Sequence, residues 1–569
     1  MKVLIVGGVA GGASAAARLR RLDEEAQIVV FERGEYISYA NCGLPYYVGG
    51  EITDKKALTL QTPQSFRDRF NIDVRVGSEV TAIDRANRTV TVRVLSTGES
   101  YTESYDKLLL SPGAESFRPP IPGVGHSRIF TLRTIPDTYR IRSFIEEERP
   151  KSAVVVGGGY IGVEMAENLT RAGLEVTVVE LADHVIGPLD YDMASFVERY
   201  LASKRVHLLL QNGVKSFSLA PGGGVAVALE KGALTADLAL LSIGVRPDSR
   251  LAKEADLAIN PRGAIVVDSH MRTSDPDIYA VGDAVEITDF VTGNPGYIPL
   301  AGPANKQGRI AADNLAGIPG EYHGTQGSSV LKLFDMTVAT TGLNERAAKA
   351  AGLDYDKVHI HGASHAGYYP GAQNLEMKVL FERKTGKILG AQLVGFDGVD
   401  KRCDVLATAI RAGMTASDLA ELELCYAPPF SSAKDPVNVA GFVIENLLAG
   451  RVKQFHWDEV AALPRDGSVT LVDTRTPEEY ARGHIDGFRN IPVDELRGRL
   501  GEFPEGKPVY LNCGTALRSY LACRILMQHG YDCYNLSGGW TVYESVMGKA
   551  GFDFSPAHPC GVKIKNGEM

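Results

Sequence analysis

Two stretches of the chain repeat one pattern: a short hydrophobic run, a glycine-rich turn, and then apolar residues at helical spacing. The first run is Lys2–Val6 with the turn Gly7–Gly12, and the second is Ala153–Val156 with the turn Gly157–Gly162. A buried strand, a tight turn and a helix produce this pattern, and we expect the first helix to end at Leu22. Two such units predict an α/β fold with two parallel sheets.

Each turn is followed by a second hydrophobic run that ends at an acidic residue. Ile28–Phe31 leads to Glu32, and Val176–Val179 leads to Glu180. In dinucleotide-binding units the helix N-terminus holds the pyrophosphate, and an acid at this strand end accepts a hydrogen bond from a ribose hydroxyl. One such turn is a weak signal, but two with matching acids predict two dinucleotides. The alternative is a turn without a ligand, and Val9, in place of the middle glycine, departs from the pattern.

The pattern changes from about residue 325 onward. Alternating apolar positions there predict strands, listed in chain order as Ser328–Phe334, Thr337–Thr341, Lys378–Glu382 and Leu389–Val394, followed by helices to Leu448. Arg451–Gln454 is polar and reads as a linker, and a new α/β unit opens near Trp457 with a strand at Val469–Val472.

These patterns divide the chain into domains. Gly244–Asp248 marks the return from the second nucleotide domain into the first. The expected segments are 1–112 and 245–324 (first nucleotide domain), 113–244 (second nucleotide domain), 325–450 (α+β), 455–548 (α/β) and 549–569 (tail).

Composition narrows the function without fixing it. The net charge is −9 with both signs scattered, which argues against a nucleic-acid partner. No apolar run approaches the 18 residues of a membrane span. The seven cysteines are an odd number without paired spacing, so we expect neither a disulfide framework nor a zinc site, but reduced thiols in the cytoplasm.

Cys42 is the residue with the most specific chemistry. No second cysteine lies within six residues on either side of it. Such a thiol does not close a local disulfide, so its oxidised form is a mixed disulfide, a persulfide or a sulfenic acid. This restricts the substrates to small sulfur compounds or peroxide. We expect Cys42 at the start of a helix, where the helix dipole lowers its pKa; the alternative is a buried structural cysteine.

These motifs resemble those of flavoprotein disulfide reductases, and residues 1–445 are similar to the coenzyme A-disulfide reductase branch. The matching pieces are Gly7–Ser14, Tyr39–Cys42, Thr62-Pro63 with Phe66, Ser111–Ala114, the segment around Asp283, His365–Gly371, Asp400–Arg402 and Tyr426–Pro429. Residues 455–545 resemble a rhodanese domain, with matches at Val472–Arg475, Gly483–Ile485, Cys513–Arg518 and Gly538–Trp540. The whole is similar to coenzyme A-disulfide reductase–rhodanese fusions and NADH-dependent persulfide reductases. Phe430 departs from the branch, which usually has a tyrosine there.

The resemblance implies a fold of two Rossmann-like domains, an α+β dimerisation domain and a rhodanese domain. It implies FAD and NADH as cofactors (NADPH less so, because of Glu180), coenzyme A, and a homodimer through residues 325–445, with no metal. The implied cofactor-binding residues are Gly7, Gly8, Ala10, Gly11, Gly12, Glu32, Arg33, Asn41, Val80, Ser111, Pro112, Gly113, Gly157, Gly159, Tyr160, Ile161, Gly162, Glu180, Gly244, Gly282, Asp283, Pro299, Leu300 and Ala301.

It also assigns roles at the reductase site. NADH delivers hydride to FAD, which reduces sulfur held by Cys42, while Ser38 and Asn41 orient the substrate. Tyr368 and Tyr426 of a dimer mate protonate or hydrogen-bond a leaving thiolate, or else only pack at the interface. Arg18 and Arg21, three apart on one helix face, bind the phosphates of coenzyme A, or else form a solvated basic face.

At the rhodanese-like site, the loop from Cys513 to Ser519 follows a strand at Pro508–Asn512 and precedes a helix. Backbone N–H groups of such a turn form an anion nest that stabilises a persulfide anion. Four residues separate Cys513 from Arg518, the spacing of sulfur transferases, whereas related phosphatases have five. Cys523 and Cys533 look like core positions, and Asp473 with Arg475 like a structural ion pair.

The leading hypothesis is therefore an NADH-dependent reductase of coenzyme A persulfide, polysulfide or coenzyme A disulfide, coupled to sulfane sulfur transfer at Cys513. One alternative is a sulfurtransferase whose flavin half is a scaffold or redox sensor. Another is an NADH peroxidase or oxidase, which Ala10 disfavours, because such relatives carry a histidine at that position.

Overall fold

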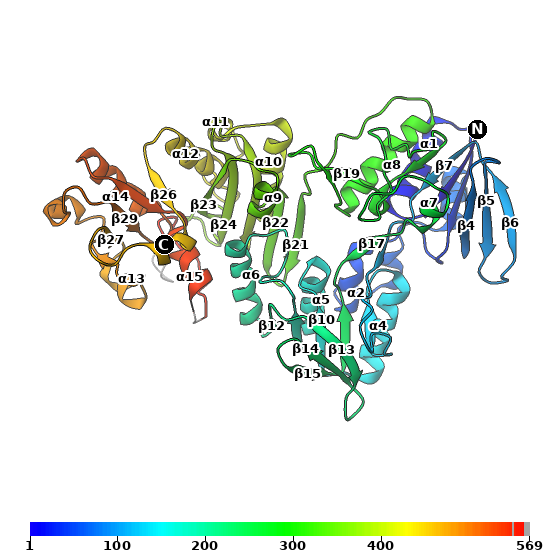
Figure 1. Ribbon diagram of the computed structural model, residues 1–569, viewed down its shortest axis with the longest axis horizontal. Helices are drawn as coiled ribbons and strands as arrows, with labels where there is room; N and C mark the ends of the chain where they lie inside the picture. The colour runs from blue at the N-terminus through cyan, green and yellow to red at the C-terminus, as the bar shows by residue number, and fades with distance from the viewer. Residues whose placement is uncertain (549–550, 563–569) are drawn as a thin grey trace. The chain divides into compact units, whose positions relative to one another are not determined.

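The computed structural model describes residues 1–548 and 551–562, and the chain forms two compact units (Figure 1). The first unit comprises Met1–Ala182 and Val206–Gly327; the second comprises Asp183–Arg205 and the chain from Ser328 onward. None of the described helices combines the length and the apolar composition that a membrane span needs.

A five-stranded parallel sheet is the centre of the first nucleotide domain. Its strands, in spatial order, are β18 (Ile278–Ala280), β7 (Lys107–Leu110), β1 (Lys2–Val6), β2 (Gln27–Glu32) and β3 (Asp73–Val76). Apolar residues of these strands point to both faces, and a separate hydrophobic core lies on each. Helices α1 (Ala10–Leu22) and α8 (Ala301–Leu315) pack side by side, so closely that a Cβ built on Gly308 would lie 2.3 Å from the carbonyl oxygen of Gly11. The predicted strand–turn–helix unit is confirmed.

The second nucleotide domain repeats this plan. Its parallel strands, in spatial order, are β12 (His207–Leu209), β11 (Glu175–Val179), β10 (Ser152–Val156), β16 (Leu238–Leu241) and β9 (Ile129–Thr131). Helix α5 (Tyr160–Arg171) follows β10, and α4 (Ile135–Glu148) follows β9. Each domain also carries a three-stranded antiparallel sheet: β4 (Ser78–Asp84), β5 (Thr89–Val94) and β6 (Ser100–Ser104), and β13 (Val214–Leu219), β14 (Val225–Leu229) and β15 (Ala233–Ala236).

The second unit begins with an antiparallel sheet. Its strands, in spatial order, are β21 (Ser329–Leu333), β22 (Met336–Gly342), β25 (Ile388–Gly395), β24 (Asn374–Glu382) and β23 (Tyr355–Ala363). The accompanying helices are α6 (Tyr191–Ser203), α9 (Glu345–Ala350), α10 (Val399–Ala412), α11 (Ala416–Glu421) and α12 (Pro436–Leu448). The sequence did not predict β23, because its inward positions include Lys357 and His359, both buried and paired, which interrupt the apolar alternation.

The C-terminal α/β part contains a third parallel sheet. Its strands, in spatial order, are β26 (Lys453–Phe455), β30 (Cys533–Leu536), β29 (Val509–Asn512), β27 (Thr470–Asp473) and β28 (Arg489–Asn490), with helices α13 (Pro477–Arg482), α14 (Leu517–Gln528) and α15 (Gly539–Met547). The expectation that Arg451–Gln454 is a plain linker is wrong for its second half. Lys453 and Gln454 belong to β26, which pairs in parallel with β30.

This α/β part is docked on the antiparallel sheet and on α6, all within the second unit. His359 Nδ1 lies 3.1 Å from Ser537 Oγ, and the Ser195 and Ser545 hydroxyls are 2.5 Å apart. Gln454 Nε2 donates to the Lys357 carbonyl at 2.8 Å. Because these contacts are mostly buried, the α/β part is not a freely tethered module.

The segment 551–562, which was predicted only as a tail, packs against the rest of the same unit. The ring of Phe552 packs edge-on against Phe196, and that of Phe554 against Phe396, with centroids 5.5 and 5.8 Å apart. Asn374 Oδ1 accepts from the backbone N–H of Ala557 at 3.0 Å. The segment thereby reaches the loop that contains Cys513.

Candidate functional site

The first glycine-rich turn lies at the carboxyl end of the first sheet. Gly7 has φ +96°, and a Cβ there would lie 2.1 Å from the carbonyl oxygen of Ser111, so only glycine fits. Val9 caps α1 without a side-chain hydrogen bond, which leaves the first N–H groups of the helix to a ligand. Glu32 ends β2 and accepts from Gly8 N at 2.9 Å. The structure thus brings the predicted turn, Glu32 and the Ser111 segment together.

The second turn has the same geometry. Gly157 has φ +103°, and a Cβ on Gly162 would lie 1.9 Å from the Gly157 carbonyl oxygen. A Cβ on Gly159, the N-cap of α5, would meet no atom within 4 Å, so the space above this helix end is open. Glu180 accepts from Gly158 N at 2.6 Å and from Ala182 N at 2.8 Å.

Cys42 lies in a 3₁₀ turn, Asn41–Gly43, directly before helix α2 (Leu44–Val48). The cysteine is exposed, yet the protein atoms around its thiol and, next, the charge of Glu164 raise its pKa. The expected lowering of this pKa is therefore wrong in direction for the protein alone, because desolvation and this carboxylate both disfavour the thiolate. Beside the thiol, Asn41 Oδ1 is buried and has no hydrogen-bond partner among the described residues. An orphaned acceptor of this kind fits a site that a ligand completes.

Two residues near Cys42 were missed in the sequence. Arg133, which follows β9, donates to Asp283 Oδ2 at 2.7 Å, so this predicted cofactor-binding acid is also paired with a cation. Glu164 lies on α5, and its carboxylate is 3.4 Å from the hydroxyl of Tyr46 on α2. Burial and, less, Glu167 raise the pKa of Glu164 to about 7. The only indication in the sequence was the position of Glu164, which follows closely after the second glycine-rich turn.

We expect Glu164→Gln to lower the pKa of Cys42, because the ionised carboxylate disfavours a nearby thiolate. The measurement is the pH dependence of alkylation of Cys42 in reduced enzyme. Glu147→Gln, at an exposed position of α4, is the matched control and should leave the profile unchanged. An unshifted profile in Glu164→Gln would show that this charge does not act on the thiol.

The predicted basic residues line a cleft of about 370 Å³ in the first unit. Arg18, Arg21 and Ser38 all contribute to its wall, and Arg18 Nε also donates to Asp313 Oδ1 at 2.7 Å. Arg309 on α8 adds a third cation that the sequence did not indicate, because it comes from a distant helix. Three guanidinium groups around one cleft suit a ligand with phosphate groups.

The other predicted cofactor positions lie at strand and helix ends or in the core. Val80 is buried in β4, so its side chain belongs to the core. Arg33 pairs with Asp248 at 3.1 Å. Gly244 (φ +100°) and Gly282 (φ +80°) occupy turns that favour glycine, and Leu300 caps α8, with Pro299 and Ala301 on either side.

In the second unit, the predicted tyrosines form a pair. The hydroxyls of Tyr368 and Tyr426 are 2.7 Å apart, and this hydrogen bond raises the pKa of Tyr368. Their side chains are 69% and 47% exposed, and Phe430, which replaces the expected tyrosine, is 70% exposed. Such exposed aromatic side chains are typical of a contact surface.

The Cys513 loop has the geometry of an anion-binding turn. Ala516, with φ +72°, caps α14, and Trp540 N donates to the Cys513 carbonyl at 2.7 Å. Ser519 Oγ donates to Cys513 Sγ at 3.2 Å, and the cysteine is fully buried. Arg518 makes a bidentate ion pair with Glu479, at 2.7 and 2.8 Å. Glu479 was missed, since the sequence places it on a different helix, α13.

Two structural expectations for this domain are confirmed. Arg475 and Asp473 form a buried ion pair at 2.7 Å. Cys523 and Cys533 lie in the core of the domain, on α14 and β30.

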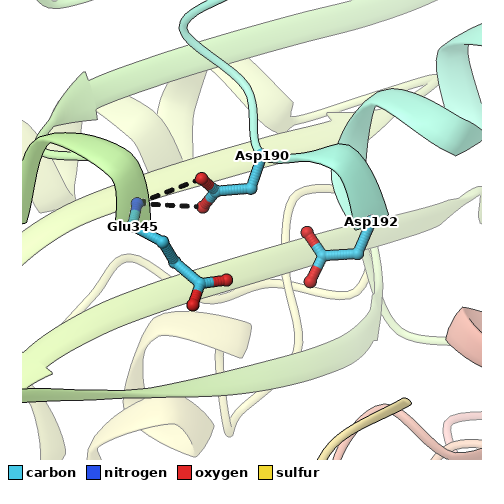
Figure 2. Close-up of side chains that lie close together, drawn as sticks. All are labelled: Asp190, Asp192 and Glu345. Carbon is cyan, nitrogen blue, oxygen red and sulfur yellow. Dashed lines mark hydrogen bonds between the residues drawn. The ribbon is translucent and has the colours of Figure 1, made fainter. Parts of the chain in front are cut away.

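Three carboxylates of the second unit lie close together, those of Asp190, Asp192 and Glu345 (Figure 2). One oxygen atom of each lies within 4.8 Å of the other two. The backbone N–H of Glu345 donates to both oxygens of Asp190. Lys378 Nζ supplies the cation for this group: it lies 2.8 Å from Asp192, 2.5 Å from Glu345 and 3.1 Å from Asp190. Burial opposes ionisation of Asp192, but Lys378 and His359 hold its pKa well below the usual range. The cluster joins α6 to the sheet.

Replacing Lys378 by methionine is expected to destabilise the fold by about 3–5 kcal/mol, because Asp190 and Asp192 would lose their buried lysine and Glu345 would keep only Lys357. The urea midpoint of the full chain measures this. Lys349→Met, at an exposed position on α9, is the control and should change stability by less than about 0.5 kcal/mol. Equal midpoints for the two variants would contradict a structural role for the cluster.

Comparison with known proteins covers most of the chain. Residues 1–308 match the family described as pyridine nucleotide-disulphide oxidoreductase, and residues 328–436 match the dimerisation domain of that family. Residues 456–545 match the rhodanese-like domain family.

Individual relatives extend these matches. The chain is 36% identical over 450 residues to a coenzyme A disulfide reductase of Staphylococcus haemolyticus, covering 78% of this chain and 100% of the relative. The crystal structure of reduced Bacillus anthracis CoADR-RHD is similar with a TM-score of 0.94 and 50% identity, over 96% of this chain and 98% of that one. An NAD-dependent persulfide reductase from A. fulgidus is similar with a TM-score of 0.89 and 38% identity, over 95% and 100%.

Proposed function

Because this chain belongs to the pyridine nucleotide-disulphide oxidoreductase family, we propose that it is an NADH-dependent reductase of coenzyme A persulfide and coenzyme A disulfide with a coupled sulfurtransferase domain. One observation carries the proposal. Cys42 is the single cysteine among residues 1–327, and it lies within the first nucleotide domain. A reductase with one thiol there must hold its substrate as a mixed disulfide or persulfide.

The family implies FAD and a nicotinamide dinucleotide as cofactors. The turns at Gly7 and Gly157 have the conformations that place helix N-termini against pyrophosphates, and Glu32 and Glu180 would accept from the ribose hydroxyls. A carboxylate at Glu180 repels a 2′-phosphate, which favours NADH over NADPH. When bound, FAD supplies the path by which two electrons of NADH reach the sulfur at Cys42.

The proposed reaction at Cys42 is a thiol–persulfide exchange followed by reduction of the mixed disulfide. The Cys42 thiolate attacks the coenzyme A sulfur of CoA–S–SH, forms Cys42–S–S–CoA and releases HS⁻. Asn41, with its unpartnered Oδ1, and Ser38 orient the incoming group. Overall, CoA–S–SH, NADH and one proton give CoA–SH, H₂S and NAD⁺. Tyr368 and Tyr426, presented by the mate of a homodimer, would donate a proton to the departing thiolate.

Cys513 supplies the persulfide. Its thiolate attacks the outer sulfur of a donor R–S–SH, keeps that sulfur as Cys513–S–SH and releases the thiolate R–S⁻. Coenzyme A, as its thiolate, then takes the outer sulfur as CoA–S–SH and restores the Cys513 thiolate. Arg518, held by Glu479, provides positive charge at the loop, and Ser519 donates to the sulfur.

The test is steady-state NADH oxidation with coenzyme A persulfide, coenzyme A disulfide and polysulfide as separate substrates. We expect kcat/KM for a coenzyme A substrate to exceed that for oxygen and for peroxide. Rapid NADH consumption in air without a sulfur substrate would instead support an oxidase, and a flavin that NADH bleaches only slowly would support a sulfurtransferase with a redox-sensing scaffold.

Arg21→Gln is expected to raise KM for coenzyme A persulfide about tenfold, as for the loss of one charge-assisted hydrogen bond worth about 1.5 kcal/mol, with KM for NADH unchanged. The reason is its place, with Arg18, in the wall of the cleft. Lys253→Gln, exposed on α7 (Arg250–Glu254), is the control for a general effect of surface charge. An unchanged KM in Arg21→Gln would show that the phosphates of coenzyme A do not bind at this cleft.

A further inference from the structure

The segment 556–562 covers the loop that contains Cys513. Thr515 Oγ1 donates to the Pro559 carbonyl at 2.7 Å. A Cβ built on Gly514 would lie 3.1 Å from the Cα of Gly561 and 3.4 Å from the carbonyl oxygen of Cys560. The backbone of Cys560 therefore lies directly against the residue that follows Cys513.

A tight turn presents Cys560 at this place. Gly561 N donates to the His558 carbonyl at 2.7 Å, and His558 N donates to the Val562 carbonyl at 2.8 Å. The aromatic contacts of Phe552 and Phe554 and the hydrogen bond of Ala557 to Asn374 anchor the preceding chain. The position of Cys560 is thus built by several independent contacts.

Arg518 links the two cysteines. Its guanidinium interacts electrostatically with the thiols of both Cys513 and Cys560. The side chain is only 8% exposed, and its Nε has no hydrogen-bond partner among the described residues. One donor of a buried cation is therefore left for an anionic sulfur at this place.

The two thiols differ in access. Cys513 is fully buried, whereas Cys560 is partly exposed. Gly514 and Gly561, the neighbours of the two cysteines, both line a cavity of about 220 Å³, together with Arg475, Arg482 and Trp540. A sulfur atom carried on Cys560 is closer to an acceptor from outside than one carried on Cys513.

We propose that Cys560 is a second sulfur carrier of the sulfurtransferase site, which takes the sulfane sulfur from Cys513 and passes it to a small thiol. The Cys560 thiolate attacks the outer sulfur of Cys513–S–SH. A bond forms between Cys560 Sγ and that sulfur, the bond to Cys513 Sγ breaks, and the products are Cys560–S–SH and the Cys513 thiolate. No oxidant or reductant is needed, since one persulfide replaces another. The proposal rests on the proposed sulfur transfer at Cys513.

The test follows sulfur through the holoenzyme. The full chain is loaded with one equivalent of polysulfide, quenched with an alkylating agent at increasing times, and mapped by mass spectrometry for cysteines that carry one extra sulfur atom. We expect the label on Cys513 first and on Cys560 afterwards, and its loss from Cys560 on addition of coenzyme A. Cys425, exposed in the same unit, should stay unlabelled.

Two variants separate the possible outcomes. In Cys513→Ser, Cys560 should remain unlabelled; in Cys560→Ser, Cys513 should load normally and discharge to coenzyme A more slowly. Label on Cys513 that never reaches Cys560, label on Cys560 in Cys513→Ser equal to wild type, or a Cys513–Cys560 disulfide in place of the second persulfide would overturn the proposal. No label on Cys513 itself would overturn the proposed sulfur transfer as well, and so distinguishes the two failures.

Discussion

Replacing Cys42 by serine is expected to lower kcat for NADH oxidation with coenzyme A persulfide by about 1,000-fold or more. Serine has nearly the same shape, but its hydroxyl does not attack sulfur at neutral pH, and no other cysteine occurs in residues 1–327 to replace the thiol. The mixed disulfide with coenzyme A does not form, so electrons from NADH have no sulfur acceptor.

Flavin content and flavin reduction by NADH serve as the control for Cys42→Ser. Because Cys42 is exposed and lies outside the hydrophobic cores, the protein should keep its fold and its flavin, and NADH should still bleach the flavin absorbance. Loss of bleaching would point to a damaged cofactor site. Turnover equal to wild type would remove Cys42 from the mechanism and with it the proposed function.

Cys513→Ser is expected to lower the rate of NADH oxidation with polysulfide or a thiosulfate-derived donor by about 100-fold or more. The rate with preformed coenzyme A persulfide should stay unchanged. The division follows from the roles proposed for two separate thiols: Cys513 would make the persulfide, and Cys42 would consume it. Steady-state rates of the same preparation on both substrates measure it.

The docking of the C-terminal α/β part bears on how the sulfur travels. His359, Ser195 and Lys357 hold that part on the second unit, so a swinging linker is not what brings Cys513 toward an acceptor. In the proposed function, coenzyme A would then carry the sulfur between the sites. Equal loss of activity on both substrates in Cys513→Ser, or no loss on either, would contradict this division of labour.

The elements that could be predicted were those with local determinants. The turns at Gly7 and Gly157 need positive φ and the absence of a Cβ, which only glycine supplies, so a short stretch of sequence fixes strand, turn and helix together. The strand β23 was missed, because Lys357 and His359 point inward to partners that are distant in the sequence. Buried polar residues interrupt the apolar pattern of a strand, and the sequence does not reveal the distant residues that pair with them.

The same reason explains which site residues were found. Cys42, Cys513 and the acids at the strand ends lie inside motifs. Arg133, Glu164 and Arg309 lie on elements that only the folded chain brings to the site. Cys560 belongs to no motif, and its relation to Cys513 depends on aromatic contacts of a segment that was predicted only as a tail.

The buried join between the antiparallel sheet and the α/β part also sets a rule for protein engineering. A truncation after Gly450 would remove Ser545 from Ser195, Ser537 from His359 and the side-chain amide of Gln454 from the Lys357 carbonyl. A reductase-only version therefore needs compensating substitutions at these positions. Conversely, the C-terminal α/β part can be fused to another protein only if that protein offers a surface with the same polar contacts.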